Sequence, residues 1–111
     1  MELSSEHVGD ICILTIPDET LTADNVKSFR TEMDQFLIPN ARILLDLGQL
    51  RFVDSSGIGS IISVMKKIKS SGGELKLCSV SKTVNSVFEL VKINLLVDVC
   101  ETREDALESF G

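Results

Sequence analysis

Short apolar runs alternate along this sequence with longer segments whose apolar residues recur at helical spacing. The strand-like runs cover residues 2–7, 11–16, 43–47, 75–78 and 97–100, the first of them weakly. Apolar stripes at helical spacing mark the segments after residues 25, 57, 83 and 105. Such alternation is typical of parallel strands joined by right-handed helical crossovers. The pattern therefore predicts an α/β fold.

Turn and cap signals add detail to this prediction. Gly9 and Asp10 separate the first two strand-like runs and indicate a hairpin, which would make the sheet mixed. Pro39 is expected to stop the first helix, and Gly72 the second. The candidate helix N-caps among the hydroxyl residues are Thr22, Ser81 and Thr102. With 111 residues, we expect a single domain over residues 1–111, with a mostly parallel sheet of four to five strands and about four helices.

Charge and hydropathy narrow the class of protein. The formal net charge of −6 gives no positive surface for nucleic-acid phosphates, so no nucleic-acid partner is expected. No apolar run approaches the ~18 residues of a membrane span, and MELSSEHVGD lacks the basic and apolar regions of a signal peptide. We expect a cytoplasmic protein. Cys12, Cys78 and Cys100 lie in apolar stretches without a C-x-x-C pair, which favours buried, reduced thiols over zinc ligands or disulfides.

Residues 52–62 read FVDSSGIGSII and concentrate polar groups where the central strand leads into the second helix. Loops after strands often hold ligand sites in such folds. A nucleophilic serine needs a base, but the only histidine is His7, expected on the surface, and no G-x-S-x-G elbow is present. No phosphate loop occurs, and Asp46 and Asp54 alone are weak support for a metal. We therefore expect neither catalysis nor a cofactor.

Two structural roles suit the same turn. Asp54, Ser55 and Ser56 can cap the helix, and Gly57 and Gly59 allow a close approach of backbone. A hydroxyl at a helix N-terminus is also well placed to carry a phosphate, because the helix dipole and free N–H groups favour an anion. Phosphorylation there would add charge against any docked partner without unfolding the protein. Capping and phosphorylation are compatible.

A polar stripe follows the turn along the second helix. Its members recur at helical spacing, opposite the Ile and Met residues, and are Ser56, Ser60, Ser63, Lys67 and Ser70. Such a stripe is a solvated helix face or a flat docking surface of small side chains. Both interpretations place these residues outward.

The segment ILLDLGQLRFVDSSGIGSII resembles the signature of the STAS-domain anti-anti-sigma factors, also called anti-sigma factor antagonists, of bacteria. That signature is an apolar strand with Asp, a short loop, an apolar pair and then Asp-Ser-Ser/Thr-Gly-Leu-Gly. The matching residues are Asp46, Phe52, Asp54, Ser55, Ser56, Gly57, Ile58 (for Leu) and Gly59. The resemblance continues through SGGELKLCSV, the helix of residues 84–90 and the closing T-x-x-x-A-L, and so covers essentially the whole chain.

The resemblance implies a protein that binds a cytoplasmic anti-sigma factor with serine kinase activity and so releases a sigma factor. The kinase would phosphorylate Ser55, the hydroxyl residue after the Asp, which breaks the complex, and a serine phosphatase would reverse this. The protein would be a substrate and a binder, not an enzyme. The residues expected at the partner surface are Asp18, Thr20, Asp54, Ser56, Gly57, Ile58, Gly59, Ser60 and Ser63.

One loop departs from the family pattern. Family members usually carry Gly and then an acidic residue that helps engage the kinase. Here Pro17 replaces the Gly, and Thr20 falls near the acidic position, just after Asp18 and Glu19. This leaves an alternative open, a STAS interaction subunit of a lipid-transport or sensory assembly that is not phosphorylated. A small enzyme using Ser55 is a third hypothesis, which lacks a base.

Overall fold

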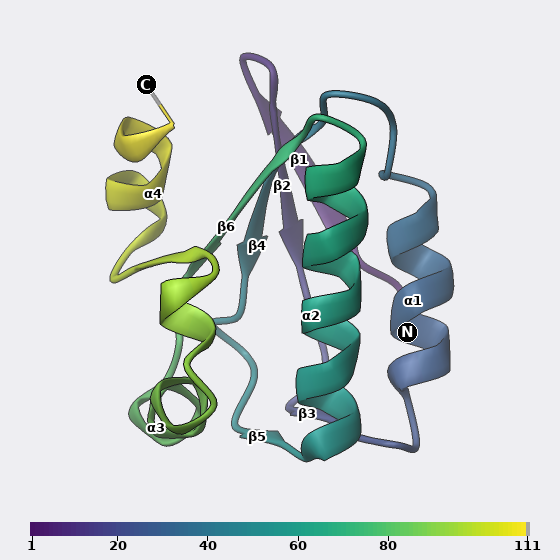
Figure 1. Cartoon of the computed structure of the whole chain (residues 1–111), viewed down its shortest axis with the longest axis vertical. Coiled ribbons are helices and arrows are strands. Elements are labelled where there is room, and N and C mark those ends of the chain that lie inside the picture. The colour runs from purple at the N-terminus through teal and green to yellow at the C-terminus, as the bar shows by residue number, and fades with distance from the viewer. Residues whose placement is uncertain (111) are drawn as a thin grey trace.

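The computed structural model describes residues 1–110 and contains a central sheet whose strands run in the order β1-β2-β4-β6-β7 (Figure 1). These strands are β1 (Ser4–Val8), β2 (Ile11–Thr15), β4 (Arg42–Asp46), β6 (Glu74–Cys78) and β7 (Asp98–Cys100). The β1–β2 pair is the antiparallel hairpin expected around Gly9, and every other pair in this sheet is parallel. The prediction of a mixed, mostly parallel sheet is confirmed.

Helices cover both faces of this sheet. They are α1 (Val26–Asp34), α2 (Ser55–Ser70), α3 (Lys82–Leu90) and α4 (Arg103–Ser109), with a short 3-10 helix η1 (Ile93–Leu95) before β7. Residues of α1, α2 and α3 form one apolar core with the sheet, whereas Ala106 of α4 belongs to a separate, smaller core that includes Ile13 and Leu44. Because β4 has helices on both faces, its three middle residues are all apolar and buried.

A second, two-stranded sheet was not predicted from the sequence. It pairs β3 (Thr20–Leu21) with β5 (Phe52–Val53) in parallel, and both lie at the end of the molecule where α2 begins (Figure 1). The Glu19 carbonyl extends this pairing by accepting the N–H groups of Arg51 and Phe52 at 2.7 and 3.2 Å. The pairing holds the loop after β2 beside the turn that precedes α2.

Two of the three hydroxyl caps are confirmed. Ser81 and Thr102 accept the N–H groups of Val84 and Asp105 at the starts of α3 and α4. Thr22 is not the cap of α1, because its carbonyl starts a turn and the helix begins only after Asn25. The first helix also ends at Asp34, so Pro39 does not terminate it directly.

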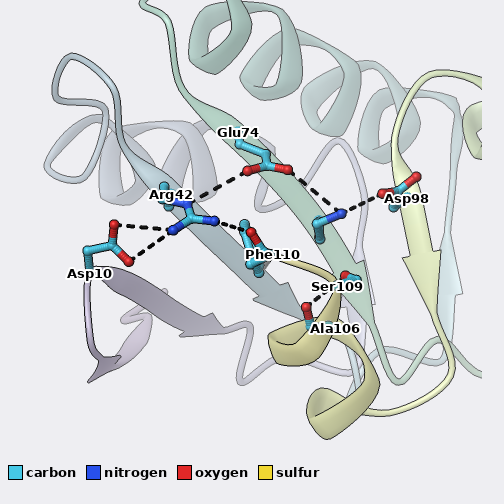
Figure 2. Close-up of polar contacts among 8 residues, drawn as sticks. Asp10, Arg42, Glu74, Asp98, Ala106, Ser109 and Phe110 are labelled. Carbon is cyan, nitrogen blue, oxygen red and sulfur yellow. Dashed lines mark hydrogen bonds and ion pairs between the residues drawn. The ribbon is translucent and has the colours of Figure 1, made fainter.

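A charged network lies where the strands start and holds the end of α4 (Figure 2). Arg42 contacts Asp10 at 3.2 Å and Glu74 at 3.7 Å, and Lys76 contacts Glu74 at 3.7 Å and Asp98 at 2.5 Å. The cationic groups of Arg42 and Lys76 each lie 5.3 Å from the centre of the buried Phe110 ring. We name these residues the strand-start cluster: Asp10, Arg42, Glu74, Lys76, Asp98 and Phe110.

Candidate partner site at the start of α2

The Asp54 carboxylate joins two segments that are distant in sequence. Its Oδ1 accepts the N–H of Gly57 at 2.8 Å, which caps α2, and its Oδ2 accepts the N–H of Ala23 at 3.1 Å, in the loop before α1. The N–H of Gly57 is the main cause that lowers the pKa of Asp54 from its ordinary value. Asp54 is thus an ionised N-cap, as predicted, and it also ties the turn to the neighbouring loop.

The two glycines of the turn have different surroundings. A Cβ on Gly57 would lie 2.1 Å from the backbone oxygen of Leu21, so only glycine fits this crossing of backbones. A Cβ on Gly59 would meet no atom within 4 Å. Gly59 is exposed, one helical turn after Ser55. The fold therefore requires Gly57 but not Gly59, which leaves a bare stretch of helix backbone facing solvent.

Ser55 and Ser56 are the first two residues of α2. Asp54 alone supplies the side-chain cap, so the expectation that these serines also cap the helix is wrong. Ser55 is exposed and Ser56 is half-buried. None of the hydrogen bonds found within residues 1–110 uses the Ser55 hydroxyl. Of the two hydroxyls, that of Ser55 is the more accessible to a partner.

The polar stripe of α2 lies beside α1, and only its last members, Lys67 and Ser70, are exposed. Ser60 is 0% exposed and donates its hydroxyl to the carbonyl of Gly57 at 2.7 Å, and Ser63 is half-buried. Lys67 pairs at 3.7 Å with Asp34, the last residue of α1, which packs beside α2 (Figure 1). The prediction of an outward serine stripe is therefore wrong at Ser60, because small side chains there allow two helices to approach closely.

The outward face of α2 is formed by residues one position earlier in the sequence. Ser55, Gly59 and Lys66 are exposed and Ile62 is half-exposed, at the spacing of one helix face. Gly57 and Ile58 are buried beneath this surface. The sequence alone carries no signal for this choice of face, because it depends on how α1 packs beside α2.

The loop after β2 is ordered by Asn25. Its side-chain amide donates to the carboxylate of Asp18 at 2.9 Å and to the carbonyl of Thr20 at 2.8 Å, while its oxygen accepts the N–H of Thr22 at 2.9 Å. Glu19 and Thr20 are exposed, whereas Asp18 is half-buried. The partner residues predicted in this loop thus lie beside the α2 turn, through the β3–β5 pairing and the Ala23–Asp54 contact.

Sequence reasoning missed Phe52 as a surface residue. Its side chain is 53% exposed on β5, next to the buried Val53, so the alternation of a half-buried strand was present but only two residues long. An exposed aromatic ring two residues before Asp54 adds apolar contact area to the turn. Phe52, Glu19 and Ser55 are therefore all exposed on segments that the β3–β5 pairing brings together.

Other chemistry has little support around this turn. Asp46 is held by Arg103 at 3.0 Å and accepts the N–H of Gly48 at 2.8 Å, so its carboxylate is already occupied. Within residues 1–110, no group of three or more His, Cys, Asp or Glu side chains could hold a metal ion. His7 is exposed on β1. No helix in the same part of the chain has the length and apolar character to cross a membrane.

Comparison with known proteins identifies the family. The STAS domain model matches residues 2–106. A Thermotoga maritima protein provisionally named an anti-sigma factor antagonist is 32% identical over 103 residues, which is 91% of this chain and 90% of the relative. A crystal structure of such a protein from Thermotoga maritima superposes with a TM-score of 0.86 at 29% identity, covering 96% of this chain and 92% of that one.

The anti-sigma factor antagonist SpoIIAA, solved in its unphosphorylated form, has the same fold with a TM-score of 0.76 at 22% identity, covering 97% of this chain and 95% of that one. Its phosphorylated form from Bacillus gives a TM-score of 0.70 at 20% identity, with 98% and 99% covered. The matched family model spans the sheet, the α2 turn and most of α4. This chain belongs to the STAS domain family.

Proposed function

We propose that this protein is an anti-sigma factor antagonist that works by binding, not by catalysis. It binds a cytoplasmic anti-sigma factor that is also a serine kinase, and this frees the sigma factor. Phosphorylation of Ser55 ends the binding, and a serine phosphatase restores it. The names of the similar proteins support the general function, and a phosphorylated form of SpoIIAA supports the type of switch.

The observation that carries the proposal is the accessible Ser55 hydroxyl beside the bare backbone at Gly59. A kinase must bring its active site onto the hydroxyl oxygen, and Ser55 is exposed at the first position of α2. One turn later, Gly59 has open space where a side chain would lie. Since a glycine inside a helix costs about 0.5–1 kcal/mol relative to Ala, its presence on an exposed face favours close contact with a partner.

Phosphate on Ser55 would keep the fold and change the surface. The group adds about −1.5 to −2 charges, and the free N–H groups and dipole of a helix N-terminus tolerate an anion. It would stand next to the ionised carboxylate of Asp54, which is already engaged by Gly57 and Ala23. A partner fitted to the unmodified turn would then meet concentrated negative charge, and every ~1.4 kcal/mol of lost binding is a tenfold loss of affinity.

The surrounding residues take different parts in this surface. Thr20 and Gly59 are exposed and would contact the partner directly, while Asp18, Ser56 and Ser63 are half-buried at its edge. The residues at the turn that support the surface from beneath are Asp54, Gly57, Ile58 and Ser60. Thr20 lies near the position where the family usually carries an acidic residue. We propose that the neighbouring, exposed Glu19 takes the role of that acidic residue.

Affinity capture from a lysate of the source bacterium tests the binding step. The baits are the tagged wild type, Ser55→Asp and two matched controls, Ser56→Asp next to the site and Ser70→Asp at the far end of α2. We expect wild type and Ser70→Asp to retain a common protein that Ser55→Asp loses by about tenfold or more, the effect of ~1.4 kcal/mol. Ser56→Asp should show a smaller loss because its side chain is half-buried.

The captured protein is then incubated with the wild type, Mg²⁺ and ATP. Trypsin places Ser55 on the peptide of residues 52–66 together with three other serines, so fragment ions must assign the phosphate. We expect it on Ser55 and on no residue in Ser55→Ala. Equal capture by Ser55→Asp and the wild type, with no phosphate transferred, would contradict the proposal and favour the unphosphorylated STAS interaction subunit.

A further inference from the structure

Two of the three cysteines are neighbours across a pair of strands. Cys78 ends β6 and Cys100 ends β7, and their Cα atoms are direct partners in the parallel register. Both side chains lie on the face of the sheet covered by α4, because Cys78 belongs to the core of Ala106 and Phe110 and Cys100 packs against it. Cys12 packs against the core on the opposite face.

This placement is close to what a disulfide needs. Neighbouring strands lie about 4.8 Å apart, within the Cα separation of about 4.4–6.8 Å found in disulfides. The side chains of directly paired residues on parallel strands point the same way. They must therefore tilt toward each other to bring their Cβ atoms to the separation of about 3.5–4.5 Å found in disulfides. The short edge strand β7 has a neighbour on one side only, so it can make that adjustment more readily than a central strand.

We propose that Cys78 and Cys100 are a modification site, which a hydroperoxide converts reversibly into an intramolecular disulfide. The two thiols are both free in this structure. Reversible disulfides in a reducing compartment are usually redox-sensing and not structural. This inference does not rest on the proposed partner or on Ser55.

The two sulfur atoms have different roles in the step. Because Cys100 is only half-buried, peroxide can reach its Sγ. This Sγ lies 3.8 Å from the Ser109 hydroxyl. Its thiolate attacks one peroxide oxygen, hydroxide leaves, and a sulfenic acid forms. The Cys78 sulfur then attacks the sulfenic sulfur, and the displaced oxygen leaves with the Cys78 proton as water. The sum is two thiols and one molecule of hydrogen peroxide giving one disulfide and two waters; an organic hydroperoxide would release an alcohol in place of the first water.

The environment of Cys78 suits the second role. Burial is the main cause that raises the pKa of this thiol to about 11, which disfavours its reaction with peroxide from solution. Its attack on the sulfenic sulfur depends on its position directly opposite Cys100 in the strand register. Because the backbone or side chains of Cys78 and Cys100 must distort to form the disulfide, the bond stores strain. A strained disulfide is more easily reduced than an unstrained structural one. The disulfide would close the chain from β6 to β7 around α3 and η1.

Hydrogen peroxide treatment of the reduced full-length protein, followed by alkylation, tests this site. Trypsin separates the cysteines onto three peptides, residues 1–27 with Cys12, 77–82 with Cys78 and 93–103 with Cys100. We expect the intact protein to lose the mass of two hydrogen atoms. The peptides 77–82 and 93–103 should become linked, and alkylation at both cysteines should disappear until dithiothreitol restores it.

The control variants separate this pair from other thiol chemistry. Cys12→Ser should form the same link, and Cys100→Ser should lose it while keeping the circular dichroism spectrum of the wild type. Cys78→Ala provides a second test if Cys100→Ser does not fold. A link through Cys12, a disulfide between two molecules as the main product, or irreversible oxygen addition at Cys100 would overturn the proposal.

Discussion

The start of α2 and the strand-start cluster both concentrate polar groups, but they use them differently. In the strand-start cluster, Arg42 and Lys76 are each shared between two carboxylates and the ring of Phe110, so the charges satisfy one another (Figure 2). At the start of α2, the Asp54 carboxylate accepts backbone N–H groups, and the Ser55 hydroxyl is exposed. The first arrangement joins layers of the fold, and the second leaves the Ser55 hydroxyl exposed at the surface.

This contrast indicates where substitutions should affect stability and where they should affect binding. Groups that satisfy one another inside the protein contribute little to recognition. Groups left exposed on a rigid support cost little to remove from the fold. The predictions below test this separation, beginning with the largest expected loss of stability.

Phe110→Ala should be the most destabilising of these changes. The ring is 6% exposed, packs in the core beneath α4 and contacts the cationic groups of Arg42 and Lys76. Truncating a buried Phe costs about 3–5 kcal/mol, and we expect the lower end here because Phe110 lies at the end of the short helix α4. Urea unfolding measures it, with Ser109→Ala as the matched control. A loss as small as that of the control would show that the cluster does not hold α4.

Gly57→Ala should have the next largest effect, and the largest among the changes at the α2 turn. The new Cβ would lie 2.1 Å from the Leu21 oxygen and 3.0 Å from its carbonyl carbon, so β3 and the helix start must separate. Overpacking of this kind costs about 1–3 kcal/mol. Urea unfolding again measures the change. Wild-type stability would mean that the crossing of α2 and β3 is looser than this geometry.

Asp54→Asn should have a smaller effect, and one that depends on pH. The pKa of Asp54 is lowered from 3.8 in the folded protein, chiefly by the N–H of Gly57, so the carboxylate stabilises the fold above the unfolded-state pKa. That contribution is lost as the pH falls below 3.8 through the folded-state value. Asn keeps an oxygen for Gly57 but replaces the other oxygen, which accepts from Ala23, by a donor.

The measurement compares the wild type and Asp54→Asn by urea unfolding between pH 7 and pH 3. Their difference in free energy of unfolding should be constant near neutrality and should shrink in acid. A difference that stays the same down to pH 3 would assign the effect to cap geometry alone and not to the charge.

Much of the central sheet could be predicted from the sequence, because the period of the apolar residues and the turn and capping residues between them are local signals. The hairpin at Gly9 and the caps at Asp54, Ser81 and Thr102 each depend on a few neighbouring residues. The β3–β5 pairing could not be predicted, since it joins two-residue strands from distant parts of the chain. The prediction that Ser60 of α2 points outward was wrong for a similar reason, because its burial depends on a distant segment of the chain.

For the α2 serines, the helical period predicts which residues share a face but not which neighbour covers it. Ser60 is buried because α1 packs beside α2, and this packing belongs to the tertiary structure. Likewise, Gly57 and Gly59 look equivalent in the sequence, and only the position of Leu21 distinguishes them. The sequence therefore predicts where a candidate site would lie, and the packing of distant segments decides which side chains are accessible there.

Gly59→Ala is the smallest expected change in stability and has the opposite sign. No atom lies within 4 Å of the new Cβ, and Gly59 is inside α2, so Ala should stabilise the protein by about 0.5–1 kcal/mol through helix propensity. If a partner approaches this backbone, the same methyl group should weaken capture in the lysate experiment. Gain of stability with loss of binding would separate the two regions most clearly. Gain of stability with unchanged binding would place the partner surface elsewhere, and loss of stability would show that the fold also requires this glycine.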